Sequence, residues 1–465
     1  MDTVPSTNAH VEKETADGIR ALIEWAAVIG LEAIPQPILR KAVIVMADDV
    51  AAMIAARSEP QVQRVYEQLL REGGHPEASV FLGGQQRIGR ISAALVNGIA
   101  GSWCELDEGY RLAPCHGGLY TLPAVLAEAE ACDLEVAQVL RSIVLSYEVI
   151  ARIARCWIFP QLTLHPHPQN AAIGGAAASG LARGFDAHTL MQAVTAAASL
   201  TTVGHFRHAV EGAFVRNVWA AVGCTNGMRA ADWALCGIGG TPGTPYAVFT
   251  ELLGQEPQPQ FLTADLGKTW AITQGYHKIH GCCQSTHSAV EAMLLARERM
   301  PRGNGPRQIE RIELETHRPG MSNRKPPTTL AARFSFEHVV AATCVYGEAG
   351  VSAFSTQALE HPEVARLRER VEIRPFEPAL PRPHDRPARL TLHFSDGGSV
   401  STECLSARGG PDQPFDEDVI LGKVEHIAAG VYPAFVRTVR ALARLEKPQM
   451  HARWRDTVAA LTASA

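Results

Sequence analysis

The stretch Leu164-His165-Pro166-His167-Pro168-Gln169-Asn170 leads directly into a run of small residues, Ala171 to Gly184, near the middle of the chain. Its two prolines disfavour helical geometry in the residues before them, which predicts that His165 and His167 lie on a stiff loop. The small residues predict a helix that begins near Asn170 and packs closely against its neighbours. Free N–H groups at the start of such a helix would favour an anionic ligand beside the two histidines.

Apolar residues at helical spacing extend to both sides of this run. Gln36 to Arg57 carries apolar side chains on one face and has a proline at an allowed position in its first turn. The first half of the chain is therefore predicted to form a compact helical bundle with several fully buried members. The further predicted helices cover Pro123 to Ala131, Leu134 to Ile153, Ala171 to Ala182, Ala187 to Leu200 and Val218 to Leu235.

The pattern changes from helical to strand-like after about Leu266. From Ile312 to Thr316, apolar residues alternate with charged ones, which predicts a strand exposed at the edge of a sheet. A second alternation runs from Leu390 to Phe394, up to the turn Asp396-Gly397-Gly398, and a third runs away from that turn, from Val400 to Cys404. This arrangement predicts a β-hairpin.

Helical patterns return from Pro414 onward. At 465 residues the chain is too long for one ordinary core, which favours two domains. The prediction is a mainly α protein, in which a large helical domain of residues 1–266 plus 406–465 carries an inserted, smaller α+β lid domain of residues 267–405.

The composition is typical of a globular enzyme, with 46% hydrophobic and 20% charged residues. The net charge of -5 argues against a nucleic-acid partner. The sequence shows neither a signal peptide nor an apolar run of membrane-spanning length, so we expect a cytoplasmic protein with no membrane contact. The ten cysteines form no Cys-x-x-Cys pair and the eighteen histidines no His-Glu-x-x-His motif, so we expect no metal site and no cofactor.

The order of short motifs along the chain resembles that of the MmgE/PrpD family, which includes 2-methylcitrate dehydratase, cis-aconitate decarboxylase and iminodisuccinate epimerase. Each motif is weak alone, but the resemblance covers nearly the whole chain. The motifs are Ala93-Ala94-Leu95-Val96-Asn97-Gly98, Leu106-Asp107-Glu108, His116, His165-Pro166, Gly174-Gly175-Ala176-Ala177-Ala178, Glu211-Gly212 through Arg216, Lys278 through Cys282-Cys283, Thr286-His287-Ser288-Ala289 and Ala332-Arg333-Phe334-Ser335.

The resemblance implies a homodimer with a metal-independent active site between a helical domain and a lid, acting on a small polycarboxylate substrate. It also implies chemistry that starts with proton abstraction beside a carboxylate. The intermediate then loses water, loses carbon dioxide or is reprotonated on the other face. These reactions share a need for a base, an acid and cations that hold the carboxylates.

Four residues at the motifs are candidates for catalysis. His165 is the first candidate for the base or acid, although a loop histidine that only caps the following helix is the alternative. His116 also titrates near neutral pH, but the family's usual His-Pro-Ser is His116-Gly117 here. Asp107 could fix the tautomer of a histidine or contact a substrate hydroxyl, or it could be a solvated acid at a helix end. Lys278 could bind a carboxylate or transfer a proton, or be an ordinary surface lysine.

Two of the remaining candidates depart from the family pattern. Arg216 stands where relatives usually carry lysine, so this position can clamp a carboxylate but cannot act as a base. His338 stands where relatives carry tyrosine, and it could donate a proton at a lower pKa and with a shorter reach. Arg333, slightly earlier in the same segment, is a further candidate for contact with the substrate.

Two more candidates, Cys283 and His287, lie four residues apart in the sequence. Cys283 falls where the decarboxylases carry a histidine that lines the pocket, which argues against a decarboxylase of that particular kind. His287 opens a predicted helix that runs to Glu298, so its role is as readily structural as catalytic.

Three classes of function follow from these observations. The first is a carbon–oxygen lyase (hydro-lyase) that resembles 2-methylcitrate dehydratase and acts on a small di- or tricarboxylic acid. The second is an isomerase that epimerises an iminodisuccinate-like substrate, with a lyase that resembles cis-aconitate decarboxylase as a related alternative. The third is a family member without catalysis, for which the altered residues at 216, 283 and 338 are the argument.

Overall fold

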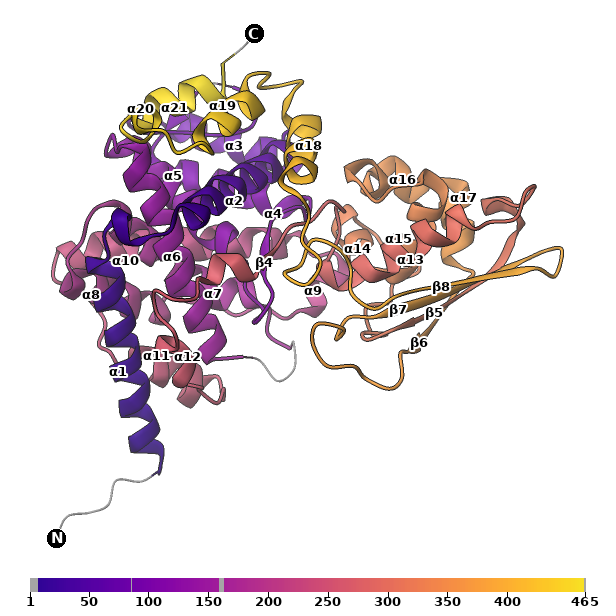
Figure 1. Ribbon diagram of the computed structural model, residues 1–465, viewed down its shortest axis with the longest axis horizontal. Coiled ribbons are helices and arrows are strands. Elements are labelled where there is room, and N and C mark those ends of the chain that lie inside the picture. The colour runs from indigo at the N-terminus through magenta and orange to yellow at the C-terminus, as the bar shows by residue number, and fades with distance from the viewer. Residues whose placement is uncertain (1–6, 85, 159–162, 464–465) are drawn as a thin grey trace.

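The computed structural model describes residues 7–84, 86–158 and 163–463. The fold is mainly α-helical, as the sequence predicts, with a large helical body joined to a smaller body that contains a four-stranded sheet (Figure 1). Within the described residues, no helix is both long and apolar enough to cross a membrane. The first six residues, at the end where a signal peptide would stand, lie outside the described part.

The larger body combines helices from both ends of the chain (Figure 1). Those from the first part are α1 (Thr7–Val28), α2 (Gln36–Ala55), α3 (Pro60–Glu72), α4 (Arg90–Trp103), α5 (Gly117–Ala131), α6 (Val136–Cys156), α7 (Pro166–Ala182), α8 (Ala187–Ser199), α9 (Arg207–Glu211), α10 (Trp219–Leu235), α11 (Thr244–Tyr246) and α12 (Gln260–Thr263). Those from the end are α18 (Glu417–Ala428), α19 (Phe435–Leu442), α20 (Lys447–Met450) and α21 (Trp454–Leu461). Helix α18 packs against α2 and α21 against α5, so the end of the chain returns to its beginning.

Helix α7 is buried along its whole length at the centre of this body. A Cβ atom added at Gly175 would collide with the backbone of Cys224 in α10, and one at Gly227 with the backbone of Ala172. The two helix backbones therefore touch, which only small residues allow. This confirms the prediction of a closely packed, fully buried helix.

The start of α7 corrects one prediction. The helix begins at Pro166 rather than near Asn170, so His167 lies in its first turn and not on a loop. Prolines are tolerated there because the first N–H groups of a helix have no partner within it. His165 is the N-cap residue, and its Nδ1 atom lies 3.3 Å from the backbone nitrogen of His167.

The other predicted helices are confirmed to within a few residues by α2, α6, α8 and α10. Helix α5 is longer than predicted, because it begins at Gly117 and holds Pro123 inside. The sequence signal is weak there because two glycines open the helix, and glycine disfavours helices. The first of them, Gly117, cannot be a larger residue, because a Cβ atom there would collide with the ring of Tyr147.

The smaller body is a four-stranded sheet with helices on one face (Figure 1). Strand order is β6-β5-β7-β8, with β5 and β6 parallel and the other pairs antiparallel. The strands are β5 (Ile309–Thr316), β6 (Val371–Pro375), β7 (Ala388–Phe394) and β8 (Ser399–Cys404). The helices are α13 (His287–Glu298), α14 (Thr329–Arg333), α15 (Phe336–Tyr346), α16 (Thr356–Glu360) and α17 (Pro362–Arg368).

The predicted hairpin is confirmed as β7 and β8, and the helix predicted from His287 to Glu298 is α13. The prediction for residues 312–316 is wrong in one respect. Strand β5 lies inside the sheet, between β6 and β7, and not at an edge. The alternation of charged and apolar residues reports that one face of β5 is solvent-exposed, which says nothing about its neighbours in the sheet.

The buried hydrophobic residues form two separate cores. The first runs from Ile19 to Ile272 and resumes from Ile420 to Leu461. The second lies within residues 282–394 and also takes in Ala209 of α9. We propose the boundaries 267 and 405 for the smaller domain because both changes of core fall close to them.

Candidate active site

A cavity of about 80 Å³ lies where the two bodies meet. It is far smaller than the roughly 300–1,000 Å³ of sites for drug-sized ligands, so it suits a compact substrate. Histidines and arginines dominate its polar lining. The wall residues used below are Glu105, Tyr110, Cys115, His116, His165, Phe206, Arg216, Tyr276, Cys283, Arg318, Phe334 and Arg386.

A short antiparallel ladder brings two distant segments together beside this cavity. Strand β3 (Gly109–Tyr110) pairs with β4 (Gly275–Tyr276). Because the strands are antiparallel, residues just before β3 lie opposite residues just after β4. Asp107 and Lys278 hold those positions, and Lys278 Nζ donates a hydrogen bond of 3.2 Å to Asp107 Oδ1.

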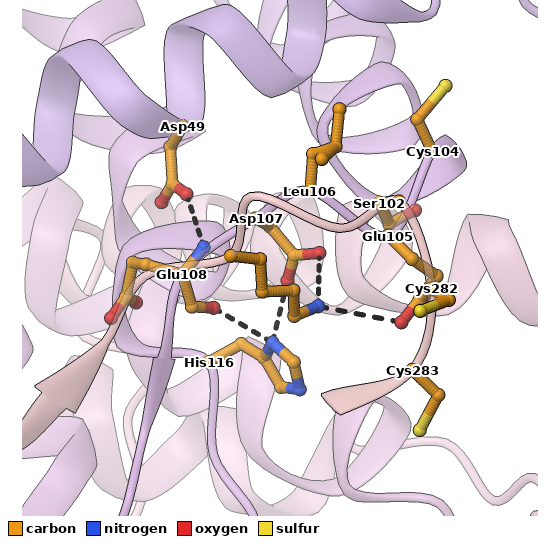
Figure 2. A network of polar contacts seen from close by, with 12 residues as sticks. Asp49, Ser102, Cys104, Glu105, Leu106, Asp107, Glu108, His116, Cys282 and Cys283 are labelled. Atoms are coloured by element: carbon orange, nitrogen blue, oxygen red, sulfur yellow. Dashed lines mark hydrogen bonds and ion pairs between the residues drawn. The ribbon is translucent and has the colours of Figure 1, made fainter. Parts of the chain in front are cut away.

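His116 and Asp107 form a hydrogen-bonded pair at the wall of the cavity. His116 Nδ1 lies 2.6 Å from Asp107 Oδ2 and 3.0 Å from the carbonyl oxygen of Glu108, as Figure 2 shows. Both partners are acceptors, so Nδ1 carries the proton and Nε2 is left with a lone pair. The second ring nitrogen of His116 points away from Asp107 (Figure 2), which leaves it available as a base.

Buried charges set the protonation states of Asp107 and Lys278. Burial alone would raise the pKa of Asp107, but the charge of Lys278 and the contact with His116 hold it below its usual value. Burial would lower the pKa of Lys278, yet the carboxylates of Asp107 and Glu105 raise it above its usual value. Lys278 therefore stays an ammonium ion, which excludes the role of base that the sequence left open.

Glu105 connects Arg216 to Lys278 and so extends the polar network around Asp107. Its carboxylate lies 2.5 Å from Arg216 Nη1 and 3.5 Å from Lys278 Nζ, and it is buried. Its backbone has a φ of 54°, a left-handed conformation that costs a residue with a Cβ roughly 1–2 kcal/mol. Sequence reasoning missed Glu105, although it stands only two residues before Asp107, which was selected.

Arg216 holds His165 in place at the wall of the cavity. It lies on the short helix Phe214–Val218, which follows the left-handed turn at Gly212, with a φ of 84°. Arg216 Nε donates a hydrogen bond of 3.2 Å to His165 Nε2. Burial and the charge of Arg216 lower the pKa of His165 well below its usual value, so this imidazole is neutral and its Nε2 lone pair is occupied.

Two tyrosines that sequence reasoning did not select complete the site, together with His167, which the sequence placed beside an anionic ligand. The ring of His167 lies 4.3 Å from that of His165 and 4.9 Å from that of His116, measured between centroids. The hydroxyl of Tyr120 lies 2.7 Å from His167 Nδ1. Tyr276 lines the cavity edge-on to His116, with centroids 6.4 Å apart, and burial raises its pKa. Tyr276 is therefore a neutral hydroxyl that can act as a proton donor.

Five of the nine sequence candidates are absent from the described lining of the cavity, and the side chains of three of these bond to backbone carbonyl oxygens instead. Arg333 Nη1 donates to the carbonyl oxygens of Cys104 and Gly281, which ties the two bodies together. His338 Nε2 lies 2.9 Å from the carbonyl oxygen of Ala353, and burial lowers its pKa to about 4. His287 Nε2 lies 3.2 Å from the carbonyl oxygen of Cys282.

The other six candidates come together. His116, His165, Arg216 and Cys283 line the cavity, while Asp107 and Lys278 contact residues that line it. Burial raises the pKa of the Cys283 thiol, so this position is a neutral wall. Among the described residues, no three His, Cys, Asp or Glu side chains gather in a way that could hold a metal ion.

Comparison with known proteins finds relatives that align with almost the whole chain. It is 25% identical over 459 residues to a cis-aconitate decarboxylase-like protein of Aspergillus oryzae, with 92% of each chain covered. It is also 25% identical over 460 residues to the cis-aconitate decarboxylase of Aspergillus terreus, with 91% of this chain and 92% of the relative covered.

Two models of one family match consecutive parts of the chain. The MmgE/PrpD N-terminal domain matches residues 20–249, and the MmgE/PrpD C-terminal domain matches residues 280–446. The two matched regions lie on either side of the segment that carries Tyr276 and Lys278. Together with relatives that align over nearly their full length, they show that the chain belongs to the MmgE/PrpD family.

Proposed function

We propose that the protein is a hydro-lyase of the 2-methylcitrate dehydratase type, which removes a proton beside a carboxylate of a small di- or tricarboxylic acid and then eliminates water. The observation that carries this proposal is the His116–Asp107 pair at the wall of a cavity lined by cations. An imidazole oriented by a buried carboxylate is an arrangement suited to a general base.

Each group in the site has a defined part in this reaction. His116 takes the proton through Nε2, and Asp107 stabilises the imidazolium that forms. Tyr276 supplies the proton that the departing hydroxide needs, because it faces the same cavity as a neutral hydroxyl. Lys278 acts through Asp107, since its charge keeps this acid ionised, and Arg216 forms an ion pair with Glu105. An elimination needs both a base and an acid, and the cavity offers one of each.

Decarboxylation is the second candidate, and the names of the relatives favour it. Cis-aconitate decarboxylases align with this chain along nearly its whole length. Loss of carbon dioxide requires one group that protonates the resulting carbanion, a role open to either His116 or Tyr276. Cys283 cannot replace the histidine that the decarboxylases are expected to carry there, because its thiol stays neutral.

Epimerisation of an iminodisuccinate-like substrate needs a proton-transfer group on each face of one carbon, for which His116 and Tyr276 are the available pair. A non-catalytic role is the weakest alternative. Burial of two acids, a lysine and an arginine is costly unless they are paired, and a scaffold has no need of such a network. The homodimer and the cytoplasmic location stay predictions.

The test is proton NMR in deuterated water with 2-methylcitrate, citrate, cis-aconitate and iminodisuccinate. We expect deuterium at the carbon beside a carboxylate together with loss of water. His116→Gln should abolish both, and His10→Gln, on the exposed face of α1, should change neither. Release of carbon dioxide or epimerisation without loss of water would overturn the hydro-lyase and select the decarboxylase or the isomerase. If none of the four acids shows deuterium exchange or a product, the proposal is overturned.

A further inference from the structure

The two cations that sequence reasoning assigned to carboxylate binding are already paired within the protein. Arg216 forms an ion pair with Glu105 and a hydrogen bond with His165. Lys278 contacts both Asp107 and Glu105, and its side chain is fully buried. Two acids thus balance two cations, and this half of the site has no net positive charge to offer a polyanionic substrate.

Two further arginines line the same cavity from the smaller body, Arg318 and Arg386. Arg318 follows the end of β5 and Arg386 precedes the start of β7. Thr316 of β5 pairs with Ala388 of β7 in an antiparallel register. Each arginine stands two residues beyond this last pair, so both leave the sheet at the same end and side by side.

Neither guanidinium group has a carboxylate partner within the described part of the chain. The acid nearest in sequence is Asp385, and Arg111 holds it with both guanidinium nitrogens of its fork. Arg318 also packs its guanidinium over the ring of Phe206, 6.0 Å from the centroid. The excess positive charge of the cavity therefore comes from Arg318 and Arg386.

The loop that carries Arg386, residues 381–387, is fastened to the larger body next to the catalytic histidine. Arg111 donates to the carbonyl oxygen of Pro383 at 3.0 Å, and Arg382 donates to that of Leu112 at 2.9 Å. Arg111 and Leu112 stand shortly before His116 in the chain. These bonds fix the position of Arg386 relative to the base before any substrate binds, which lowers the entropy cost of binding.

Unpaired cations in this position are costly without a ligand. Burial and the nearby charge of Arg111 lower the pKa of Arg386 to about 10, and burial lowers the pKa of Arg318. A bound carboxylate would offset that cost, and the planar fork of arginine matches a carboxylate through two parallel hydrogen bonds.

We propose that Arg318 and Arg386 form a subsite for the carboxylates of the substrate that are remote from the reacting carbon, and that this subsite selects polycarboxylates over monocarboxylates. The proposal rests on the proposed function for the position of the reacting carbon, beside His116. The two arginines bind and orient, while the proton moves at His116.

The test measures binding of an unreactive probe, so that it does not depend on turnover. Tricarballylate and butyrate are titrated into the wild-type protein and into Arg318→Gln, Arg386→Gln and Arg386→Lys by calorimetry. We expect each glutamine variant to weaken tricarballylate binding about tenfold or more, since charge-assisted bidentate pairs are among the strongest hydrogen bonds. Arg386→Lys should recover part of that loss, and butyrate should bind weakly to all four proteins.

Arg374→Gln is the matched control, because Arg374 lies exposed on β6 and contacts only Glu372 among the described acids. Circular dichroism melts verify that the variants are folded. If Arg386→Gln does not fold, Arg386→Lys keeps the test valid. Unchanged tricarballylate affinity in both Arg318→Gln and Arg386→Gln would overturn the subsite, as would equal affinity of the wild type for tricarballylate and butyrate.

The result separates this proposal from the proposed function. Tight arginine-dependent binding of tricarballylate, without deuterium exchange into any tested acid, would support the subsite and overturn the hydro-lyase. Deuterium exchange that persists with an unchanged Michaelis constant in both glutamine variants would support the chemistry and overturn the subsite. If both hold, the variants raise KM for a tricarboxylate at least about tenfold and change kcat much less, as expected for loss of uniform binding.

Discussion

The Nδ1 atom of His116 lies 2.6 Å from Oδ2 of Asp107, and this contact decides which nitrogen of the imidazole keeps its lone pair. Asp107→Asn offers the histidine an amide that can donate as well as accept, so the opposite tautomer becomes available and the base is lost. We expect kcat to fall about 10³- to 10⁴-fold in a folded protein.

The measurement is steady-state kinetics on the acid that the NMR panel identifies. Asp17→Asn, on the exposed side of α1, is the control and should leave kcat unchanged. A loss of less than about tenfold for Asp107→Asn would show that the orientation of His116 by Asp107 is not needed for the reaction.

Tyr276→Phe removes the hydroxyl that we assign to the departing hydroxide and keeps the ring that packs on His116. We expect loss of water to slow about 10²-fold or more, while exchange of the substrate proton with deuterium continues, because His116 is intact. The two rates are followed in one NMR experiment. Tyr66→Phe, which removes a peripheral hydroxyl bonded to Gln86, should alter neither rate. Equal slowing of exchange and elimination would contradict the assignment of Tyr276 as acid.

Glu105→Gln keeps the shape of a side chain that faces two buried cations but removes its charge. Arg216 then loses its ion pair and Lys278 loses one of two. Breaking a buried pair by removal of one partner costs about 3–5 kcal/mol, and we expect a loss of this order in the free energy of unfolding. Urea denaturation measures it. The control is Glu417→Gln, which breaks an exposed pair with Arg40 and should change stability little. Similar effects of the two variants would contradict the importance of the buried network.

These buried contacts also show where sequence reasoning stops. Helix α13 was predicted to the residue and the β7–β8 hairpin nearly so, because periodicity and turn residues are local signals. His116 and Lys278 were selected from motifs, and the sequence suggested a histidine as the partner of Asp107, but nothing in the motif of Lys278 shows that this lysine contacts Asp107. That contact depends on a ladder of two residues per strand, too short for any alternating pattern to appear.

The errors of sequence reasoning have a similar cause, both for the residues that it missed and for the one that it misplaced. Arg318 and Arg386 meet at the cavity because β5 and β7 are paired, although the two strands lie far apart in the chain. Nothing in the sequence pairs two arginines across that distance. In contrast, Arg333 was selected from its motif, yet its guanidinium bonds to two backbone carbonyls and holds the two bodies together. A motif thus marks an important position without showing whether its residue binds the substrate or stabilises the fold.

Glu108 makes stability depend on pH. Burial, with further contributions from Asp107 and Asp48, raises its pKa from 4.5 to about 8 in the folded protein. The folded state therefore holds a proton that the unfolded state releases above pH 4.5, so this contribution is present at low pH and is lost as the pH rises through about 8. Glu108→Gln mimics the protonated acid. Its amide oxygen can still accept a hydrogen bond from the backbone N–H of Gly118, and its amide nitrogen can donate one to the hydroxyl of Tyr147.

We expect the urea midpoint of the wild type to fall between pH 5 and pH 8 by more than that of Glu108→Gln. Glu425→Gln, at an exposed position on α18, should keep the wild-type slope. A slope that is the same in the wild type and in Glu108→Gln would show that Glu108 is ionised in the folded protein throughout this range.

The contact between α7 and α10 gives the last prediction, which concerns the scaffold beneath the site. Gly175→Ala would place a methyl group against the backbone of Cys224, and two helix backbones cannot both yield. Overpacking of this kind costs about 1–3 kcal/mol, and α7 carries His165 at its N-cap, so the strain also reaches the cavity. Gly422→Ala in α18 is the matched control, because a Cβ there meets nothing within 4 Å and alanine favours helix by about 0.5–1 kcal/mol. Opposite shifts of the urea midpoint are therefore expected for the same chemical change. Stabilisation by both variants would mean that the helices can move apart, and that the run of small residues is not what sets their distance.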